Sequence, residues 1–215
     1  MQNKKIIIIG DGGHAKIVID IIHQMNCFNI VGVTSITLEK GSNFLGYPVL
    51  GNDDILKSFS TNENLIAMGI GGYRDNTLRM NVYEKIKVLG FKFANIIHPS
   101  SIISETAILG EALVIFPGVV INTEVEIGNN SIIATASTID HESKIGKNVL
   151  ISAGVTIGAN SIIMDNVLIA LGAKVISNVR VGPNALIAAG AVVVSDILEK
   201  EKVFGIPARS KEHKL

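Results

Sequence analysis

The chain has 215 residues, of which 47% are hydrophobic but only 5% aromatic, and its 19 basic residues balance 19 acidic ones. This length fits one large or two modest domains, and the zero net charge gives no reason to expect nucleic acid or an anionic membrane as a partner. Cys27 stands alone, which excludes an internal disulfide and fits a reducing compartment. The apolar run at 6–9 is too short for a signal peptide or a membrane span, so we expect a cytoplasmic protein.

Residues 1–98 alternate between strand and helix patterns. Short apolar runs predict strands at 6–9, 29–34, 65–69 and 91–97. Apolar residues at helical spacing predict one helix over 17–25, and a second helix that Asp75 can cap and that stops at Gly90. We therefore predict a small α/β domain of the βαβ type over residues 1–98.

From residue 101 to residue 196 the sequence repeats every six residues without a slip. Every sixth residue is aliphatic: Ile103, Leu109, Ile115, Ile121, Ile127, Ile133, Ile139, Ile145, Ile151, Ile157, Ile163, Ile169, Val175, Val181, Ile187 and Val193. The residue two places earlier is nearly always small or β-branched. Such a period predicts a parallel β-helix over residues 99–215, tail included. With three hexads per turn it would have about five turns and a height of ~25 Å.

A glycine-rich turn, Gly10-Asp11-Gly12-Gly13-His14, follows the first predicted strand and opens the first predicted helix. Backbone amides there, with the helix N-terminus, can cradle a phosphate. Positions 10, 12 and 15 fit a permissive dinucleotide pattern, but that ligand calls for an acidic residue ending the second strand. Thr34-Ser35 stand at that place, and no carboxylate follows before Glu39. An alternative interpretation is that the glycines serve only a tight turn between strand and helix. We favour a nucleotide-linked ligand with its phosphates at this turn.

His141 is the only histidine in the repeat, and it lies two residues after the inward Ile139, near a corner of the coil. Asp140 and Glu142 flank it, and a neighbouring carboxylate can orient an imidazole ring for work as a general base. The alternative is an exposed corner histidine with ordinary solvated neighbours. A zinc site, as in the β-helix carbonic anhydrases, needs three protein ligands. Only His98 lies near the repeat besides His141, so no metal is expected.

Several features occur together in this chain. They are the Gly-Gly-His turn, the hexapeptide repeat, the His141-Glu142 pair and the closing Gly205-Ile206-Pro207-Ala208-Arg209. In this combination the chain resembles, over essentially its whole length, the bacterial sugar acyltransferases of the NeuD/PglD type. The resemblance implies a Rossmann-like N-terminal domain, a left-handed β-helix and a homotrimer. It also implies acetyl transfer from acetyl-CoA to sugar amino or hydroxyl groups. The substrates are often nucleotide-linked 4-amino-4,6-dideoxy sugars, and other members are associated with O-acetylation of sialic acid.

The resemblance also implies roles for individual positions. It makes His141 the catalytic base, Glu142 its support, Gly12, Gly13 and His14 the nucleotide-sugar turn, and Gly154, Gly172, Ala173 and Arg209 the contacts of CoA. Thr34, Ser35 and Tyr73 are further candidate substrate contacts that leave the base and the sugar stereochemistry open.

The chain departs from the family pattern at several positions. Thr34-Ser35 stand where the family often has acidic residues, Ala134-Thr135 where it often has Asn-Thr, Leu150 where many members carry a second histidine, and Ala159 where a glycine is common. The base is intact, whereas substrate contacts and the details of CoA binding are open.

We therefore predict direct acetyl transfer from acetyl-CoA to the amino group of a UDP- or dTDP-linked amino-deoxy sugar. His141 would take the proton in a groove between two subunits, and the Gly154 amide would stabilise the oxyanion. The alternatives are O-acetylation of a sialic-acid-like sugar and a non-catalytic scaffold that keeps the fold.

Overall fold

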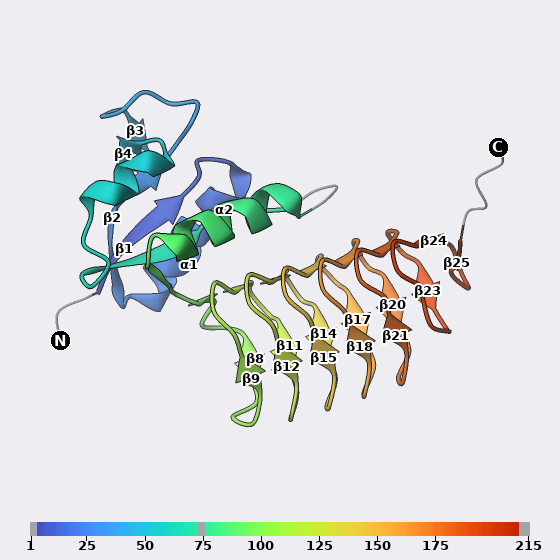
Figure 1. Cartoon of the computed structure of the whole chain (residues 1–215). Coiled ribbons are helices and arrows are strands. Elements are labelled where there is room, and N and C mark those ends of the chain that lie inside the picture. The colour runs from blue at the N-terminus through green and yellow to red at the C-terminus, as the bar shows by residue number, and fades with distance from the viewer. Residues whose placement is uncertain (1–3, 73–75, 211–215) are drawn as a thin grey trace, which may run out of the picture.

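The computed structural model describes residues 4–72 and 76–210, so Tyr73 and Asp75 lie outside the described residues. An N-terminal α/β domain is followed by a long β-helix, and helix α2 lies along one side of the coil (Figure 1). The elements of the domain are β1 (Lys4–Ile9), α1 (Gly13–Met25), β2 (Phe28–Thr34), β3 (Asn43–Phe44), β4 (Tyr47–Gly51), the 3-10 helix η1 (Asp53–Ser58), β5 (Asn64–Met68), α2 (Thr77–Val88) and β6 (Lys92–Phe93). The predicted strands at 6–9, 29–34 and 65–69 and both predicted helices are confirmed.

The N-terminal sheet has the order β3-β4-β2-β1-β5-β6, with β1 in parallel pairing between β2 and β5. Ile6 to Ile9 of β1 are fully buried, because the sheet is covered on both faces. Ile6 and Ile8 pack with residues of α1, whereas Ile7 and Ile9 pack with residues of η1 and α2. None of the helices in the described residues is long and apolar enough to cross a membrane.

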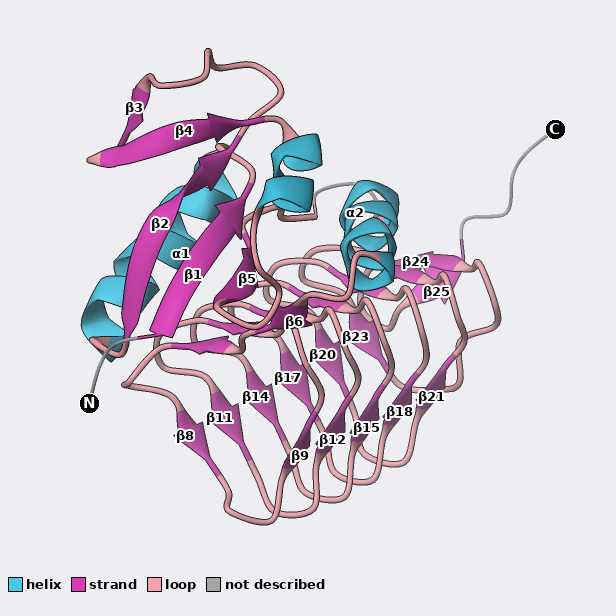
Figure 2. Cartoon of the chain, turned by 60° about the vertical axis from the view of Figure 1, so that its left-hand side comes forward, coloured by secondary structure: helices cyan, strands magenta, loops and turns pink. Residues whose placement is uncertain are grey.

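The repeat forms short parallel strands at a constant six-residue spacing, stacked into three sheets (Figure 2). They are β7 (Ile96–Ile97), β8 (Ile102–Ile103), β9 (Ile108–Leu109), β10 (Val114–Ile115), β11 (Val120–Ile121), β12 (Glu126–Ile127), β13 (Ile132–Ile133), β14 (Thr138–Ile139), β15 (Lys144–Ile145), β16 (Leu150–Ile151), β17 (Thr156–Ile157), β18 (Ile162–Ile163), β19 (Leu168–Ile169), β20 (Lys174–Val175), β21 (Arg180–Val181), β22 (Leu186–Ile187) and β23 (Val192–Val193). The antiparallel pair β24 (Lys202–Phe204) and β25 (Arg209–Ser210) closes the coil. The predicted β-helix is confirmed.

A residue with positive φ turns the chain at each corner of the coil, again every six residues. The first corner has Ala112, Asn130, Asn148, Asn166 and Asn184, the second has Gly118, Ala136, Gly154, Gly172 and Gly190, and the third has Glu124, Glu142, Asn160 and Asn178. Glycine and asparagine dominate because they adopt the left-handed conformation at the lowest cost. The alanines and glutamates are the exceptions.

The single strand predicted over 91–97 is wrong, because two short strands occupy it. β6 joins the N-terminal sheet beside β5, whereas β7 pairs with β10 of the coil. The coil therefore begins at β7, before the domain boundary that was predicted at residue 98. Asn95, between them, bonds the carbonyl of Gly110 and the amide of Leu113. This side chain fastens the link to the first coil.

The N-terminal domain packs on the sheet of the coil that contains β10, β13, β16 and β19. Outward residues of these strands are buried: Val114, Ile132, Leu150 and Leu168. Arg79 of α2, itself 1% exposed, joins the two parts. Its guanidinium donates to the carbonyls of Met68 and Ile70 in the domain and of Ala112 and Asn130 in the coil. No acidic partner is recorded for it among the described residues.

Candidate functional site

The glycine-rich turn places the N-terminus of α1 at the carboxyl end of β1. Gly10 needs its lack of a side chain for conformation, because its φ is +96°. Gly12 and Gly13 have no such need, and a Cβ built on either would meet nothing within 4 Å. Gly12 caps α1 without a side-chain hydrogen bond, and no acidic residue lies in the first turn. The free amides of the helix therefore face open space, the arrangement that binds an anion.

That open space is a cavity of about 680 Å³ at the carboxyl end of the N-terminal sheet. It brings together Gly12, Gly13, His14, Thr34 and Ser35, the five positions expected to contact substrate. Leu78 and Val82 of α2 supply apolar lining on another side. A cavity of this size at this place in an open α/β sheet accommodates a nucleotide.

Thr34 and Ser35 line the cavity, but both side chains are buried, at 0% and 5% exposure. The Thr34 hydroxyl donates to Asp53, at 2.6 Å, and the Ser35 hydroxyl donates to Asp11, at 2.7 Å. These hydroxyls therefore position two carboxylates rather than face a ligand themselves. Sequence analysis missed both acids, since Asp11 lies in the turn and Asp53 lies beyond the fourth strand. What the two acids share is a hydrogen bond from a residue at the end of β2, and only the three-dimensional structure shows it.

His14 stands between this cavity and a second one. Burial, and then the charge of Arg79, lower the pKa of His14 to about 3, so the ring is neutral at pH 7. It stacks on Phe116, with ring centroids 5.6 Å apart. Its Nε2 is shielded from solvent and has no hydrogen-bond partner in the described structure. Buried polar atoms without a partner are rare in folded proteins, and a bound ligand or an ordered water can supply the missing partner.

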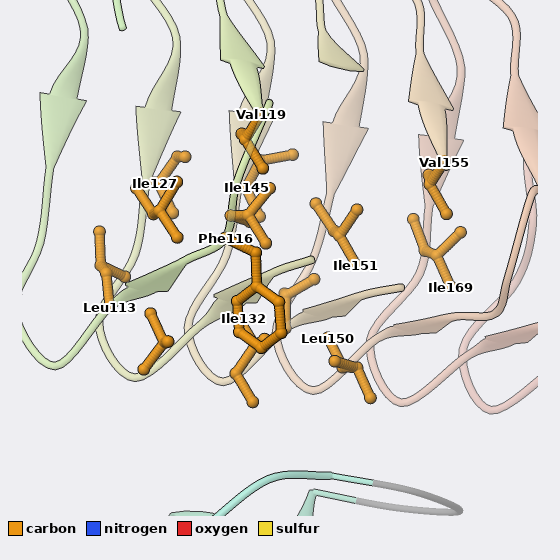
Figure 3. Packing of buried hydrophobic residues seen from close by; sticks show 14 of the residues in the cluster. Leu113, Phe116, Val119, Ile127, Ile132, Ile145, Leu150, Ile151, Val155 and Ile169 are labelled. Atoms are coloured by element: carbon orange, nitrogen blue, oxygen red, sulfur yellow. The ribbon is translucent and has the colours of Figure 1, made fainter. Parts of the chain in front are cut away.

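The second cavity, of about 310 Å³, lies between His14 and the second corner of the coil. Phe116, Ile132 and Leu150 gather on the outside of the coil at this place, as Figure 3 shows. Ala134 and Leu150, two of the departures from the family pattern, both line it. The departures therefore make this cavity more apolar, while Thr135 and Ser152 remain as polar groups.

His141 and Glu142 lie together at the third corner. The side chains are about half exposed, at 48% and 58%, and Nδ1 of His141 lies 2.9 Å from Oε2 of Glu142. Because a carboxylate only accepts, Nδ1 is the donor in this bond, and in the neutral tautomer of the ring Nε2 presents a lone pair. Asp140 accepts from the His141 amide and from Asn122, and these bonds lower the pKa of Asp140, the one from Asn122 most. Both neighbours of His141 therefore fix this corner, since Glu142 bonds the ring and Asp140 bonds the backbone amide.

Replacing Glu142 with asparagine is expected to stabilise the coil and weaken the function. Glu142 has φ +60°, a conformation that asparagine tolerates better, so we expect a gain of about 0.5–1 kcal/mol in the free energy of unfolding. The loss of the carboxylate at Nδ1 is expected to lower turnover by roughly tenfold. Thermal unfolding and acetyl-transfer rates measure the two effects. Glu124→Asn, at the same corner one coil earlier with φ +56°, should stabilise without the loss of turnover. Equal turnover in both variants would contradict the role of Glu142.

The positions expected to contact CoA differ in what they offer. Gly154 and Gly172 stack at the second corner, but their amides already donate to Thr135 and Ala153, at 2.9 and 3.0 Å. The expected oxyanion role of the Gly154 amide is therefore wrong, because its left-handed conformation turns the N–H into the neighbouring coil. By contrast, Ala153 lines the second cavity, and no bond of its N–H is recorded within the described ranges.

Ala173 and Arg209 differ from these glycines. Ala173 is 0% exposed and fills the interior of the coil, so its side chain cannot touch CoA. The contact expected at Ala173 is between CoA and the coil backbone, which the inward side chain does not exclude, so it stays a prediction. Arg209 is exposed in β25 at the far end of the coil, near the C-terminal end of Figure 1. Within the described part of the chain, no three His, Cys, Asp or Glu side chains are grouped to hold a metal ion.

His141 and the cavities occupy different corners of one chain. His141 lies at the third corner, whereas the cavity with His14 opens at the second. The sheet of β8, β11, β14, β17, β20 and β23 separates them. Its outward residues are Ile102, Val120, Thr138, Thr156, Lys174 and Val192, a single charge among six. The next sheet is more polar, with Glu126, Lys144 and Arg180 outward.

Comparison with known proteins bears on these features. Residues 5–86 match the PglD N-terminal domain family. The acetyltransferase domain of PglB from Neisseria gonorrhoeae FA1090, solved with acetyl coenzyme A, is 30% identical with a TM-score of 0.87, over 97% of this chain and 100% of that chain. PerB from Caulobacter crescentus, solved with CoA and GDP-perosamine, is 31% identical with a TM-score of 0.81, over 97% of both chains.

A curated relative also matches part of the chain. The UDP-N-acetylbacillosamine N-acetyltransferase of Bacillus subtilis (strain 168) is 29% identical over 115 residues, or 52% of this chain. The chain spans about half (51%) of the length of this curated relative.

Proposed function

Because the chain belongs to the family of PglD- and PglB-type sugar acetyltransferases, we propose that it transfers acetyl from acetyl-CoA to the amino group of a nucleotide-linked amino-deoxy sugar. The finer assignment is a 4-amino-4,6-dideoxy sugar. The residue roles below belong to the same proposal.

One observation carries the proposal: the uncapped N-terminus of α1 opens into a cavity at two glycines that packing does not require. If the turn served only to reverse the chain, side chains would be tolerated at positions 12 and 13, and glycine would not be needed at either. The absence of side chains leaves room for a ligand to approach the backbone closely. The diphosphate of a nucleotide sugar is such a ligand, since it is anionic and fits the helix dipole.

The sugar would then extend past His14 into the second cavity, which shares His14, Gly71 and Gly72 with the first. The neutral ring of His14 can bond a sugar oxygen or nitrogen through Nε2 without adding charge. Ala134, Leu150 and Leu171 present an apolar wall, which suits a deoxygenated face of the sugar.

His141 acts as the general base in this proposal. The sugar amine attacks the thioester carbonyl, Nε2 of His141 takes the amine proton, and the C–S bond breaks to release CoA. Glu142 holds Nδ1–H and stabilises the imidazolium that forms. The N–H of Ala153, at the wall of the second cavity, is the candidate donor to the oxyanion.

Assembly of a trimer would bring the two corners together. If the weakly charged sheet of β8, β11, β14, β17, β20 and β23 faces the threefold axis, the third corner of one subunit meets the second corner of the next. His141 would then point at the cavity of its neighbour. Neither corner alone holds a base and a sugar pocket, so we expect the monomer to be inactive.

A substrate panel tests the proposal. CoA release from acetyl-CoA is followed with UDP-, GDP- and dTDP-linked 4-amino-4,6-dideoxy sugars, with the matching 4-hydroxy sugars, and with free sialic acid. We expect turnover only with the nucleotide-linked amines. Turnover confined to sialic acid or to the hydroxy sugars would overturn N-acetylation, and no turnover with any acceptor would favour a non-catalytic scaffold.

A further inference from the structure

Asp11 is unusual for its place in the chain. It lies in the glycine turn that leads into α1, where a carboxylate pointing at the helix N-terminus would repel a diphosphate. The side chain is instead held away from the turn. Oδ2 of Asp11 accepts from the hydroxyls of Ser35 and Thr37, each at 2.7 Å, just beyond the end of β2.

Strand pairing explains how a residue after β1 reaches the end of β2. The two strands are parallel, with Ile9 opposite Thr34, so the residues that follow them lie side by side at the carboxyl edge of the sheet. Both hydrogen bonds are accepted by Oδ2, so Oδ1 of Asp11 takes part in neither of them. Desolvation raises the pKa of Asp11, but the hydrogen bonds from Ser35 and Thr37 outweigh it and lower the pKa overall. The carboxylate is therefore ionised at neutral pH.

In open α/β sheets with phosphates at the first helix, the ribose lies at the end of the second strand, where an acidic residue binds its hydroxyls. Here the residues that end β2, Thr34 and Ser35, are not acidic. We propose that Asp11 supplies this carboxylate from the turn and selects a ribonucleotide, by accepting hydrogen bonds from the 2′- and 3′-hydroxyl groups of the ribose. This rests on the proposed function, because the phosphates must lie at α1. It favours UDP- or GDP-linked sugars over dTDP-linked ones.

Asp53 is the competing carboxylate in the same cavity. It accepts from the Thr34 hydroxyl and stands at the start of η1, after β4. Strand β4 lies one position further from β1 than β2 does. A ribose attached to phosphates at α1 reaches the end of β2 first, so Asp11 is the nearer partner.

Binding of paired nucleotides to the full-length protein tests the proposal. Dissociation constants are measured by calorimetry for UDP and 2′-deoxy-UDP, and for GDP and 2′-deoxy-GDP. We expect the better-bound ribonucleotide to bind about tenfold more tightly than its deoxy partner, since a hydrogen bond to a charged group is lost. In Asp11→Asn the ratio should fall to about twofold, chiefly by weaker binding of the ribonucleotide.

The outcomes separate this proposal from the proposed function. Asp11→Asn that weakens both members of a pair equally would show a structural role only, and overturn selection by Asp11. A wild-type ratio near one, or a ratio that Asp53→Asn abolishes and Asp11→Asn keeps, would overturn it as well. Nucleotide binding and amine acetylation would persist in each of these cases, so the proposed function would stand. Failure of all four nucleotides to bind would overturn selection by Asp11, and failure of dTDP to bind as well would overturn the nucleotide-linked substrate of the proposed function.

Discussion

Replacing His141 with alanine is expected to reduce acetyl transfer by about 10²–10⁴-fold, the usual contribution of a positioned general base. The loss should fall on kcat, because in the proposed mechanism the ring takes the amine proton and does not bind the nucleotide or CoA. The fold should persist, since the side chain is 48% exposed and lies outside the coil. Steady-state kinetics, with the melting temperature measured beside them, checks both expectations.

Thr123→Ala is the matched control for His141. Thr123 occupies the same place at the third corner one coil earlier, and within the described residues its hydroxyl has one side-chain partner, the hydroxyl of Thr106. It should keep wild-type turnover if the loss in His141→Ala comes from the base rather than from disturbance of the corner. Undiminished turnover in His141→Ala would remove His141 from the mechanism.

Replacing Arg79 with methionine is expected to destabilise the protein by about 3 kcal/mol or more, since several buried carbonyls lose their donors at once. This is a large part of the ~5–15 kcal/mol that stabilises a typical domain. Burial lowers the pKa of Arg79 to about 9, which leaves it charged at pH 7, so the bonds are charge-assisted. Urea unfolding followed by circular dichroism measures the loss.

Arg180→Met provides the control, because Arg180 is an exposed arginine on the outside of β21. It should change stability by less than about 0.5 kcal/mol. Arg79→Lys should recover only part of the loss, since one ammonium cannot reach carbonyls on both sides of the junction. Because Ile70 lines the cavity at the N-terminus of α1, where we propose that the nucleotide binds, we also expect Arg79→Met to weaken nucleotide binding. Wild-type stability in this variant would show that packing alone holds the two parts together.

The fold could be predicted almost completely from the sequence where the order is local. The six-residue period determines the β-helix, since each hexad makes one strand and one corner whatever lies further along the chain. The isoleucine run and the glycines of β1 and α1 are equally local. The hairpin of β3 and β4 and the helix η1 were missed, because their few apolar residues give no clear period. The strand over 91–97 was wrong because pairing with two different sheets divides it at Asn95.

The sequence by itself determined the coil, the glycine turn and the position of His141 at a corner beside Glu142. Only the tertiary structure decided how these parts lie relative to one another. Parallel pairing of β1 with β2 carries Asp11 to Ser35, 24 residues away. The left-handed φ angles at the corners turn the Gly154 amide into the neighbouring coil, and they place His141 and the cavity beside His14 at different edges of the coil. Those facts depend on backbone direction and on contacts between distant segments, which no local pattern of side chains encodes.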